Sequence, residues 1–246
     1  MQTTKAAMIV IGNEILSGRT QDKNINFLAD SLNKQGITLS EVRIIPDDEQ
    51  MIIDTVKDYS EKYDYVFTTG GIGPTHDDIT SLSIAKAFDK KYILNKDAEE
   101  ILLNYYGKDN LNEARLKMAH MPEGATLLHN PVSAAPGFII DNIYVMAGVP
   151  SIMRAMFDSI KGVLKGGKIV LSKTISSFIT EGTLAKELTS IQNNFPDVEI
   201  GSYPFIENSR LGTSVVCRSS DESRLNLCSS EVENYLRTLT SELKVT

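Results

Sequence analysis

The sequence is short of cysteine, of basic charge and of long apolar segments, and each shortage excludes a class of protein. Its two cysteines, Cys217 and Cys228, lie too far apart for the CxxC pair of a zinc or redox motif. Cys217 falls in a strand-like segment and Cys228 in a helix-like one. We therefore expect two buried, reduced thiols.

Acidic residues outnumber basic ones, 32 to 25, which gives a formal net charge of −7. Because a nonspecific nucleic-acid binder needs a basic face to neutralise phosphates, this balance argues against nucleic acid as a partner. The last third of the chain also lacks the Gly-x-x-Gly clamp and the aromatic stacking set of RNA-binding modules. A locally positive pocket is still compatible with the composition.

No apolar segment approaches the roughly 18 residues that a membrane-spanning helix needs. The N-terminal residues run directly into a short strand-like segment and show no signal-peptide pattern. The sequence therefore predicts a cytoplasmic protein without a membrane partner.

Length and composition are those of a globular protein with an adequate core. At 246 residues, of which 41% are hydrophobic and 23% charged, the chain can hold one large domain, or a domain of usual size and a small one. The glycine-rich segment 162–167 is the best boundary, because the pattern of elements changes after it. We predict a first domain over residues 1–166 and a second over residues 167–246.

Short apolar runs alternate with amphipathic segments in the first domain. Three runs are typical of strands buried on both faces of a parallel sheet: Ala6–Ile11, Val42–Ile45 and Tyr65–Phe67. The resulting β-α-β-α-β-loop-α order predicts the α/β class, with a mostly parallel sheet and helices on both of its faces. Further helices are expected over 97–106, 112–120 and from residue 150, and short strands over 138–140 and 143–146.

The second domain is predicted to be a small α+β unit with the order β-α-β-β-α. The expected elements are, in chain order, 169–178, 180–194, 198–203, 213–218 and 222–243. We interpret this unit as structural or dimer-forming, with Tyr203–Phe205 and Arg210 as residues that could reach a neighbouring site.

The segment Thr68–Thr80 has the composition of a phosphate and metal site. It joins a buried strand to a helix, and such loops lie at the carboxyl end of a strand, where open α/β sheets bind ligands. Its three glycines let backbone amides approach an anion closely. Two adjacent carboxylates, Asp77 and Asp78, suit a hard divalent cation such as Mg²⁺.

A simpler interpretation exists for each aspartate of this loop. Aspartate is a favoured helix N-cap, and Gly-Pro is ordinary turn chemistry. Taken singly, Asp77 or Asp78 is better explained as a cap. Three glycines, a threonine pair and two carboxylates in one loop favour a binding site.

Acidic residues also follow the first two strands. Glu14 lies in a loop bracketed by glycines, and Asp47 follows the second strand. Since the carboxyl ends of parallel strands meet at one edge of a sheet, we expect these carboxylates near Thr68–Thr80. The acidic residues at 47–49 can also cap the helix that comes next.

A second strand, glycine loop and helix occur around Gly148–Pro150, where Pro150 fits the first position of a helix. This loop could supply more backbone amides to the same crevice, or it could be only a tight turn. His120 and His129 are isolated, and we interpret them as packed or surface imidazoles rather than metal ligands.

Thr68–Thr80 resembles the signature loop of the competence/damage-inducible protein A (CinA) family, whose first domain has the molybdopterin-binding fold. Other segments resemble further motifs of that family, in the right order along the chain. They are Gly12–Gly18, Asn24–Asn26, Asn130–Pro131, Ala135–Phe138 and Gly148–Pro150, followed in the second domain by Glu181–Gly182 and Gly201–Pro204.

The resemblance implies a domain that binds a phosphorylated pterin or a nucleotide. In the CinA branch it implies metal-dependent hydrolysis of nucleotide pyrophosphates such as ADP-ribose, and relatives fused to FAD synthases are linked to FAD hydrolysis. It places Asp47 and Asp78 in metal-assisted chemistry, supported by Asp77 and Glu14, and suggests a homodimer or homotrimer. The chain departs from the pattern at Ile72, where members often carry Thr. It also stops before the nicotinamide-nucleotide amidase domain of many members, so we expect no deamidase activity.

The leading hypothesis is a pyrophosphatase in which Asp47 and Asp78 bind Mg²⁺ or a similar ion. A metal-activated water would attack phosphorus, and His76 or Asp77 would take its proton. The residues expected to bind the phosphate or nucleotide are Thr69, Gly70, Gly71, Ile72, Gly73, Thr75, Glu14, Asn24, Asn26, Ser133, Gly148 and Pro150. Adenylyl transfer to molybdopterin, which would use the same loop, and a noncatalytic ligand-binding module are open alternatives.

Overall fold

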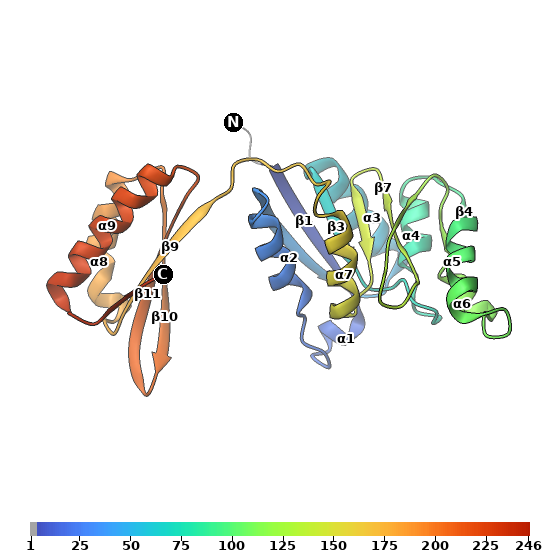
Figure 1. The fold of residues 1–246 in the computed structure, drawn as a ribbon, viewed down its shortest axis with the longest axis horizontal. Helices are drawn as coiled ribbons and strands as arrows, with labels where there is room; N and C mark the ends of the chain where they lie inside the picture. The colour runs from blue at the N-terminus through green and yellow to red at the C-terminus, as the bar shows by residue number, and fades with distance from the viewer. Residues whose placement is uncertain (1–3) are drawn as a thin grey trace. The chain divides into compact units, whose positions relative to one another are not determined.

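The computed structural model describes residues 4–246, and contacts within it divide the chain into two compact units. The first unit ends at Gly167 and the second comprises Lys168–Thr246 (Figure 1). No helix in residues 4–246 is both long enough and apolar enough to cross a membrane.

A six-stranded mixed sheet forms the centre of the first unit. Its strand order is β2-β1-β3-β8-β7-β6. Neighbours from β2 to β8 pair in parallel, whereas β7 and β6 are antiparallel additions at one edge. The bounds are β1 Thr4–Ile11, β2 Ile37–Ile45, β3 Tyr65–Thr69, β6 Thr126–Leu128, β7 Gly137–Ile140 and β8 Ile143–Met146. The predicted α/β class is confirmed.

Strand β1 shows why helices must cover both faces of this sheet. Every residue from Ala6 to Ile11 is buried, and successive side chains of a strand point to opposite faces. Ala7, Ile9 and Ile11 join a core with side chains of α3, α4 and α5. The alternate residues of the strand join a second core with side chains of α2 and α7. These two helices cover the same face of the sheet (Figure 1).

The helices of the first unit connect the strands and bring their loops to one edge. They are α1 Asn13–Leu16, α2 Asn24–Asn33, α3 Glu49–Lys62, α4 Thr80–Ala87, α5 Lys96–Tyr106, α6 Glu113–Lys117 and α7 Pro150–Ile160. The acidic residues after β2 were expected to cap α3, and Asp48 does so by accepting a hydrogen bond from the amide of Met51 at 2.8 Å.

The helix predicted over 112–120 is wrong in its second half. Helix α6 ends at Lys117, and His120–Pro122 form strand β5, which pairs with β4 (Tyr92–Leu94). Pairing with β4 buries Met121, and the proline at 122 could not continue a helix.

Strand β2 contains an irregularity that orients a carboxylate. The register with β1 shifts between Ala6 and Ala7, so Ser40 is skipped and Glu41 comes opposite Ala7. A bulge of this kind re-aims the side chains beside it. The Glu41 carboxylate accepts hydrogen bonds from the phenols of Tyr59 on α3 and of Tyr63, which follows the helix, the latter at 2.6 Å.

The second unit is an antiparallel sheet of order β10-β11-β9-β12 with two helices packed on it. The strands are β9 Leu171–Ser177, β10 Glu199–Glu207, β11 Arg210–Ser219 and β12 Leu243–Val245, and the helices are α8 Glu181–Asn194 and α9 Glu222–Leu239. The predicted terminal helix is too long, because Thr240 is already extended and Leu243 pairs with Ser177 of β9.

Both cysteines lie in the core of the second unit, as predicted. Cys217 of β11 and Cys228 of α9 are fully buried and form no disulfide. Burial raises the pKa of the Cys217 thiol to about 12, so this group stays protonated and unreactive near neutral pH.

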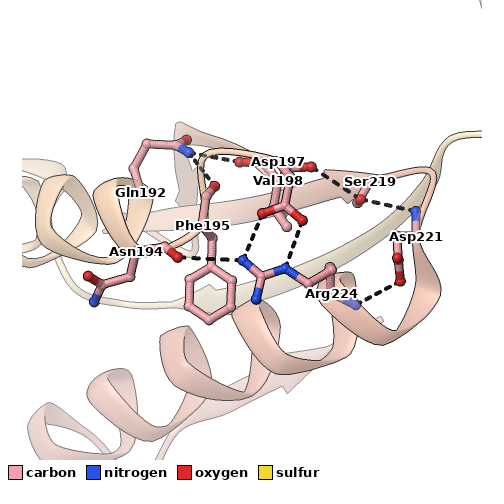
Figure 2. A network of polar contacts seen from close by, with 8 residues as sticks. All are labelled: Gln192, Asn194, Phe195, Asp197, Val198, Ser219, Asp221 and Arg224. Atoms are coloured by element: carbon pink, nitrogen blue, oxygen red, sulfur yellow. Dashed lines mark hydrogen bonds and ion pairs between the residues drawn. The ribbon is translucent and has the colours of Figure 1, made fainter. Parts of the chain in front are cut away.

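A polar network ties the ends of several elements of the second unit together (Figure 2). The guanidinium of Arg224, at the start of α9, donates two hydrogen bonds of 2.7 Å to the two carboxylate oxygens of Asp197. It also lies over the ring of Phe195, 4.7 Å from the centroid. Gln192 of α8 donates to the carbonyl groups of Phe195 and Val198 at 3.0 and 2.8 Å, which fixes the turn between α8 and β10.

Candidate functional site

The loops that follow β1, β3 and β8 surround a cleft of about 520 Å³ at the carboxyl ends of these parallel strands. This is the edge at which open α/β sheets bind ligands. The lining residues are Glu14, Thr20, Gly70, Gly71, Ile72, Gly73, Pro74, Asp78, Met118, Asn130, Ser133, Ala135, Ala147, Gly148, Val149, Pro150 and Ile152.

Gly70 is the point at which the three loops meet. Its φ of +100° is a conformation that other residues rarely adopt, and a Cβ here would overlap the carbonyl oxygen of Ile11 at the end of β1. A Cβ at Gly148 would lie 3.3 Å from the Gly70 Cα. Glycine at both positions lets the loops after β3 and β8 approach this closely.

The amide of Gly70 has a structural task. It donates to the carbonyl oxygen of Met146 at 3.2 Å and so extends the pairing of β3 with β8. The next three amides, of Gly71, Ile72 and Gly73, make no hydrogen bond to any group in residues 4–246. Free amides in a glycine-rich loop are suitable donors for an anion.

Thr80, the first residue of α4, lies directly beneath the glycine loop. Its amide donates to the carbonyl oxygen of Gly71 at 3.0 Å, and a Cβ on Gly71 would overlap its hydroxyl. The hydroxyl groups of Thr80 and Thr69 are buried and have no partner within residues 4–246. Such unpaired groups are uncommon in native cores and occur at sites that bind ligand or water.

Asp78 closes the turn before α4 and does not cap the helix. One of its carboxylate oxygens, Oδ2, accepts the amide of Thr75 at 2.8 Å and also the Thr75 hydroxyl. The N-cap of α4 is Ile79, without a side-chain capping bond. The interpretation of Asp77 or Asp78 as a helix cap is therefore wrong, and Asp78 lines the cleft with its second oxygen still without a hydrogen bond in residues 4–246.

The other two acidic loops border the same cleft in different ways. Glu14, on the short helix α1, lines the cleft directly. Asp47 is not a lining residue, and its carboxylate accepts the amide of Asn13 at 3.0 Å beside Glu14. The structure thus places Glu14 and Asp78 in the cleft and Asp47 behind the α1 loop.

Six further predicted residues lie outside the lining set, and Asn24 is one of them. Thr75 is exposed and its side chain is engaged with Asp78, while Asn26, His76 and Asp77 are exposed. Thr69 is buried at the end of β3. The pKa of the Asp77 carboxyl is lowered, first by the nearby Thr75 hydroxyl and further by the charges of His76 and Lys117. A carboxylate with a lowered pKa is a weak general base.

Two buried asparagines shape the loops of the cleft. Asn24, at the start of α2, donates to the carbonyl oxygen of Gly148 at 2.8 Å. Asn130 donates to the Ser133 hydroxyl and to the carbonyl oxygen of Ala135, both at 2.8 Å, and so holds two lining residues in place. Asn24 was predicted to contact the ligand. In the structure its side-chain amide instead holds the Gly148 loop in position.

Sequence reasoning assigned no site role to almost half of the lining residues. These are Thr20, Pro74, Met118, Asn130, Ala135, Ala147, Val149 and Ile152. Pro74, Asn130, Ala135 and Val149 belong to segments noted in the sequence, whereas Met118 had no local signal because it follows a short helix of mixed surface.

The donor set fits a divalent cation that is bound together with a phosphate ligand. No group of three or more His, Cys, Asp or Glu side chains within residues 4–246 is arranged to hold a metal ion alone. Mg²⁺ is commonly held by one or two carboxylates and the phosphates of the substrate. Glu14 and Asp78 supply that number of carboxylates in the cleft.

An open α/β sheet with a glycine loop, free amides and carboxylates at its carboxyl edge defines a phosphate- or nucleotide-binding domain. A family model described as "Probable molybdopterin binding domain" matches residues 7–166, and one described as "FAD synthase, middle domain" matches residues 169–242. The chain belongs to the family of molybdopterin-binding-domain proteins, and the predicted relation to CinA is confirmed by the structure described next.

The structure of CinA from Thermoplasma acidophilum, a protein of unknown function, superposes with a TM-score of 0.62 at 32% identity and covers 65% of this chain and 98% of its own. A protein from Archaeoglobus fulgidus is 36% identical over 80% of this chain and 84% of its own length. A Caenorhabditis elegans protein described as a probable FAD synthase is 31% identical over 91% of this chain. The chain spans 48% of that relative.

Proposed function

We propose that this protein hydrolyses the diphosphate bond of a nucleotide such as FAD or ADP-ribose. The observation that carries the proposal is the cleft itself, where residues 71–73, whose amides are free, line the same space as Glu14 and Asp78. Its volume of about 520 Å³ lies within the range of small-molecule sites. The match of residues 169–242 to a FAD synthase domain supports a flavin or adenine nucleotide as substrate.

The diphosphate would occupy the glycine loop. Amides of Gly71, Ile72 and Gly73 can donate to phosphate oxygens without breaking an existing bond. Pro150 begins α7, an 11-residue helix whose N-terminus lies at the cleft and favours an anion.

The planar ring of the nucleotide would lie against the apolar part of the lining. Ile72, Met118 and Ile152 offer apolar side chains there. Ile72 also packs against both cores of the first unit, which holds this wall in place. The apolar side chain at position 72, where a hydroxyl is frequent in the family, fits a ring contact better than a phosphate contact.

Glu14 and Asp78 are the residues that would hold a divalent cation, with Asp47 positioning α1 beside them. A cation bound there would cancel charge on the diphosphate and lower the pKa of a water molecule. The Thr75 bonds orient Asp78 toward this task. Hydrolysis adds water across the P–O–P bridge, so AMP and a second phosphorylated product form and one proton is released.

The proton acceptor follows from the same geometry. The Glu14 carboxylate lines the cleft but would already hold the cation, so it is not the acceptor. His76 and Asp77, the two residues first considered for this role, are exposed and outside the lining. Of the two, His76 is the better base, because the pKa of Asp77 is lowered.

The test is release of AMP. The protein is incubated with FAD, ADP-ribose and NADH, each with Mg²⁺, Mn²⁺ or Co²⁺, and AMP is separated by chromatography. We expect AMP and FMN from FAD, and a loss of at least about 100-fold in rate for Asp78→Asn, since a charged ligand is removed. Asp141→Asn, on the turn between β7 and β8, is the matched control. Folded protein that releases no AMP with any pair of substrate and metal would disprove hydrolysis.

Molybdopterin binding or adenylyl transfer is the second candidate. The family match over residues 7–166 favours it, because the glycine loop would hold ATP phosphates equally well. Adenylylated molybdopterin formed from ATP would establish this reaction. A noncatalytic module predicts instead that Asp78→Asn leaves ligand affinity and its dependence on metal unchanged.

A further inference from the structure

Lys117 is brought to the turn that holds Asp78 by an element far away in the sequence. It is the last residue of α6, is half-buried, and precedes Met118, which lines the cleft. Its ammonium group donates to the carbonyl oxygen of Thr75, in the turn that holds Asp78. A cationic side chain therefore lies against the loop that borders the binding space.

The side chains that line the cleft do not balance the charge of a diphosphate. Glu14 and Asp78 are carboxylates, and no lysine, arginine or histidine is among the lining residues of the described chain. A nucleotide diphosphate carries at least two negative charges of its own. Neutral backbone amides reduce this repulsion only in part, so a cationic group beside the loop would have a direct effect on affinity.

Lys117 has the charge and the donors that such a role needs. Within residues 4–246 it forms no ion pair, because its partner is a neutral carbonyl group. An ammonium has three N–H donors, and the Thr75 bond uses one of them.

We propose that Lys117 is an anion-recognition residue of this cleft, whose ammonium group contacts the phosphate chain of the bound nucleotide. This inference rests on the proposed function, because it names the group that compensates the charge of the substrate. It assigns Lys117 to substrate binding rather than to the chemical step. Loss of the charge should therefore raise KM and leave kcat nearly unchanged.

The experiment uses the full chain and inorganic pyrophosphate, a probe that tests anion binding without nucleotide hydrolysis. Titration calorimetry with Mg²⁺ present compares the natural protein with Lys117→Gln and Lys117→Arg. Lys57→Gln is the matched control, because this substitution removes the same charge. Lys57 is exposed on α3 and does not line the cleft. Thermal unfolding of each variant shows whether the fold is intact.

We expect Lys117→Gln to weaken pyrophosphate binding about 10-fold, which is the usual effect of one charge-assisted hydrogen bond. Lys117→Arg and Lys57→Gln should stay within about 3-fold of the natural protein, since both leave a cation beside the loop. The affinity of the natural protein for pyrophosphate should also fall more steeply with salt than that of Lys117→Gln. Salt screens the attraction between the Lys117 ammonium and the anion, and the variant lacks this attraction.

Equal pyrophosphate affinities for the natural protein and Lys117→Gln would overturn the inference. Equal salt dependences would overturn it too, because a purely structural role of Lys117 predicts them. Absence of pyrophosphate binding by the natural protein would overturn it too. Failure of the hydrolysis proposal is seen separately, as absence of AMP release from FAD or ADP-ribose while pyrophosphate binding and its loss in Lys117→Gln persist.

Discussion

Thr75 holds the Asp78 carboxylate through two donors on one oxygen, its amide at 2.8 Å and its hydroxyl. The second carboxylate oxygen is left without a hydrogen bond in residues 4–246 and belongs to a residue that lines the cleft. A carboxylate that is fixed before ligand arrives loses little conformational entropy on binding a cation or a phosphate-bound ion. The geometry of this turn is thus part of the proposed site.

Replacement of Thr75 by valine tests that relationship. Valine keeps the shape of the side chain and the hydrogen bond from the backbone amide of residue 75 to Asp78. Only the hydroxyl donor is lost. We expect the free energy of unfolding to fall by about 1 kcal/mol or less. AMP release should slow by about 10-fold, because the Asp78 carboxylate is oriented by one hydrogen bond instead of two. Thr75→Ser, which keeps the donor, should stay close to the natural protein. Equal rates for the valine and serine variants would contradict a role for the hydroxyl.

Gly70→Ala should damage the junction of the three loops. The change forces alanine into a φ of +100° and places its Cβ against the Ile11 carbonyl oxygen. We expect a loss of at least about 2 kcal/mol in the free energy of unfolding, measured with urea, since neither strain nor overlap is easily relieved. Gly162→Ala is the control, because it has open space and an ordinary φ, and it should change stability by no more than about 0.5 kcal/mol.

The strands, the glycine loop and the walls of the cleft differ in how far they could be predicted from the sequence. The central strands and the glycine loop could be predicted, because Ala6–Ile11 is wholly apolar and the loop follows a buried run directly. The far wall of the cleft could not, because Met118 reaches it through the fold and leaves no local pattern. Strands β4, β5 and β6 have only three residues each, too few to show an alternation. Asp78 resembled a cap in sequence, and only the Thr75 bonds reveal that it closes a turn.

Glu41 should give the first unit a stability that depends on acid pH. Hydrogen bonds from Tyr59, the larger effect, and from Tyr63 lower the pKa of the Glu41 carboxyl below its ordinary value of 4.5. A group with a lowered folded-state pKa stabilises the fold above its unfolded-state pKa, and this contribution is lost as pH falls through the folded-state value. Since 40% of the Glu41 side chain is exposed, we expect only about 1 kcal/mol at neutral pH.

The measurement compares urea unfolding of the natural protein and Glu41→Gln between pH 3 and pH 7. The amide still accepts from one phenol but does not titrate, so the difference between the two proteins should be present at pH 7 and shrink below pH 4.5. Glu61→Gln, on the helix that carries Tyr59, is the matched control. A difference that does not depend on pH would contradict the assignment.

Arg224→Lys should loosen the second unit although it conserves charge. The guanidinium of Arg224 makes two parallel bonds to Asp197 and lies over Phe195, and an ammonium can reproduce neither the fork nor the stacking. The pKa of the Asp197 carboxyl is lowered, first by the hydrogen bonds from Arg224. The pair therefore stabilises the fold above the unfolded-state pKa of aspartate, and the benefit disappears as pH falls through the lowered value.

Hydrogen exchange gives the sharpest readout of Arg224→Lys, because the network holds the turn that leads into β10. The Ile200 amide donates to the Gln192 side chain at 3.0 Å, so its protection should fall in the variant at pH 7 and differ less near pH 3. Arg237→Lys is the control, since Arg237 bonds only one oxygen of Glu233 within the same helix. Exposed pairs within one helix contribute little, and this variant should exchange like the natural protein. If both variants lost protection equally, the two-point contact between Arg224 and Asp197 would not be what holds the turn.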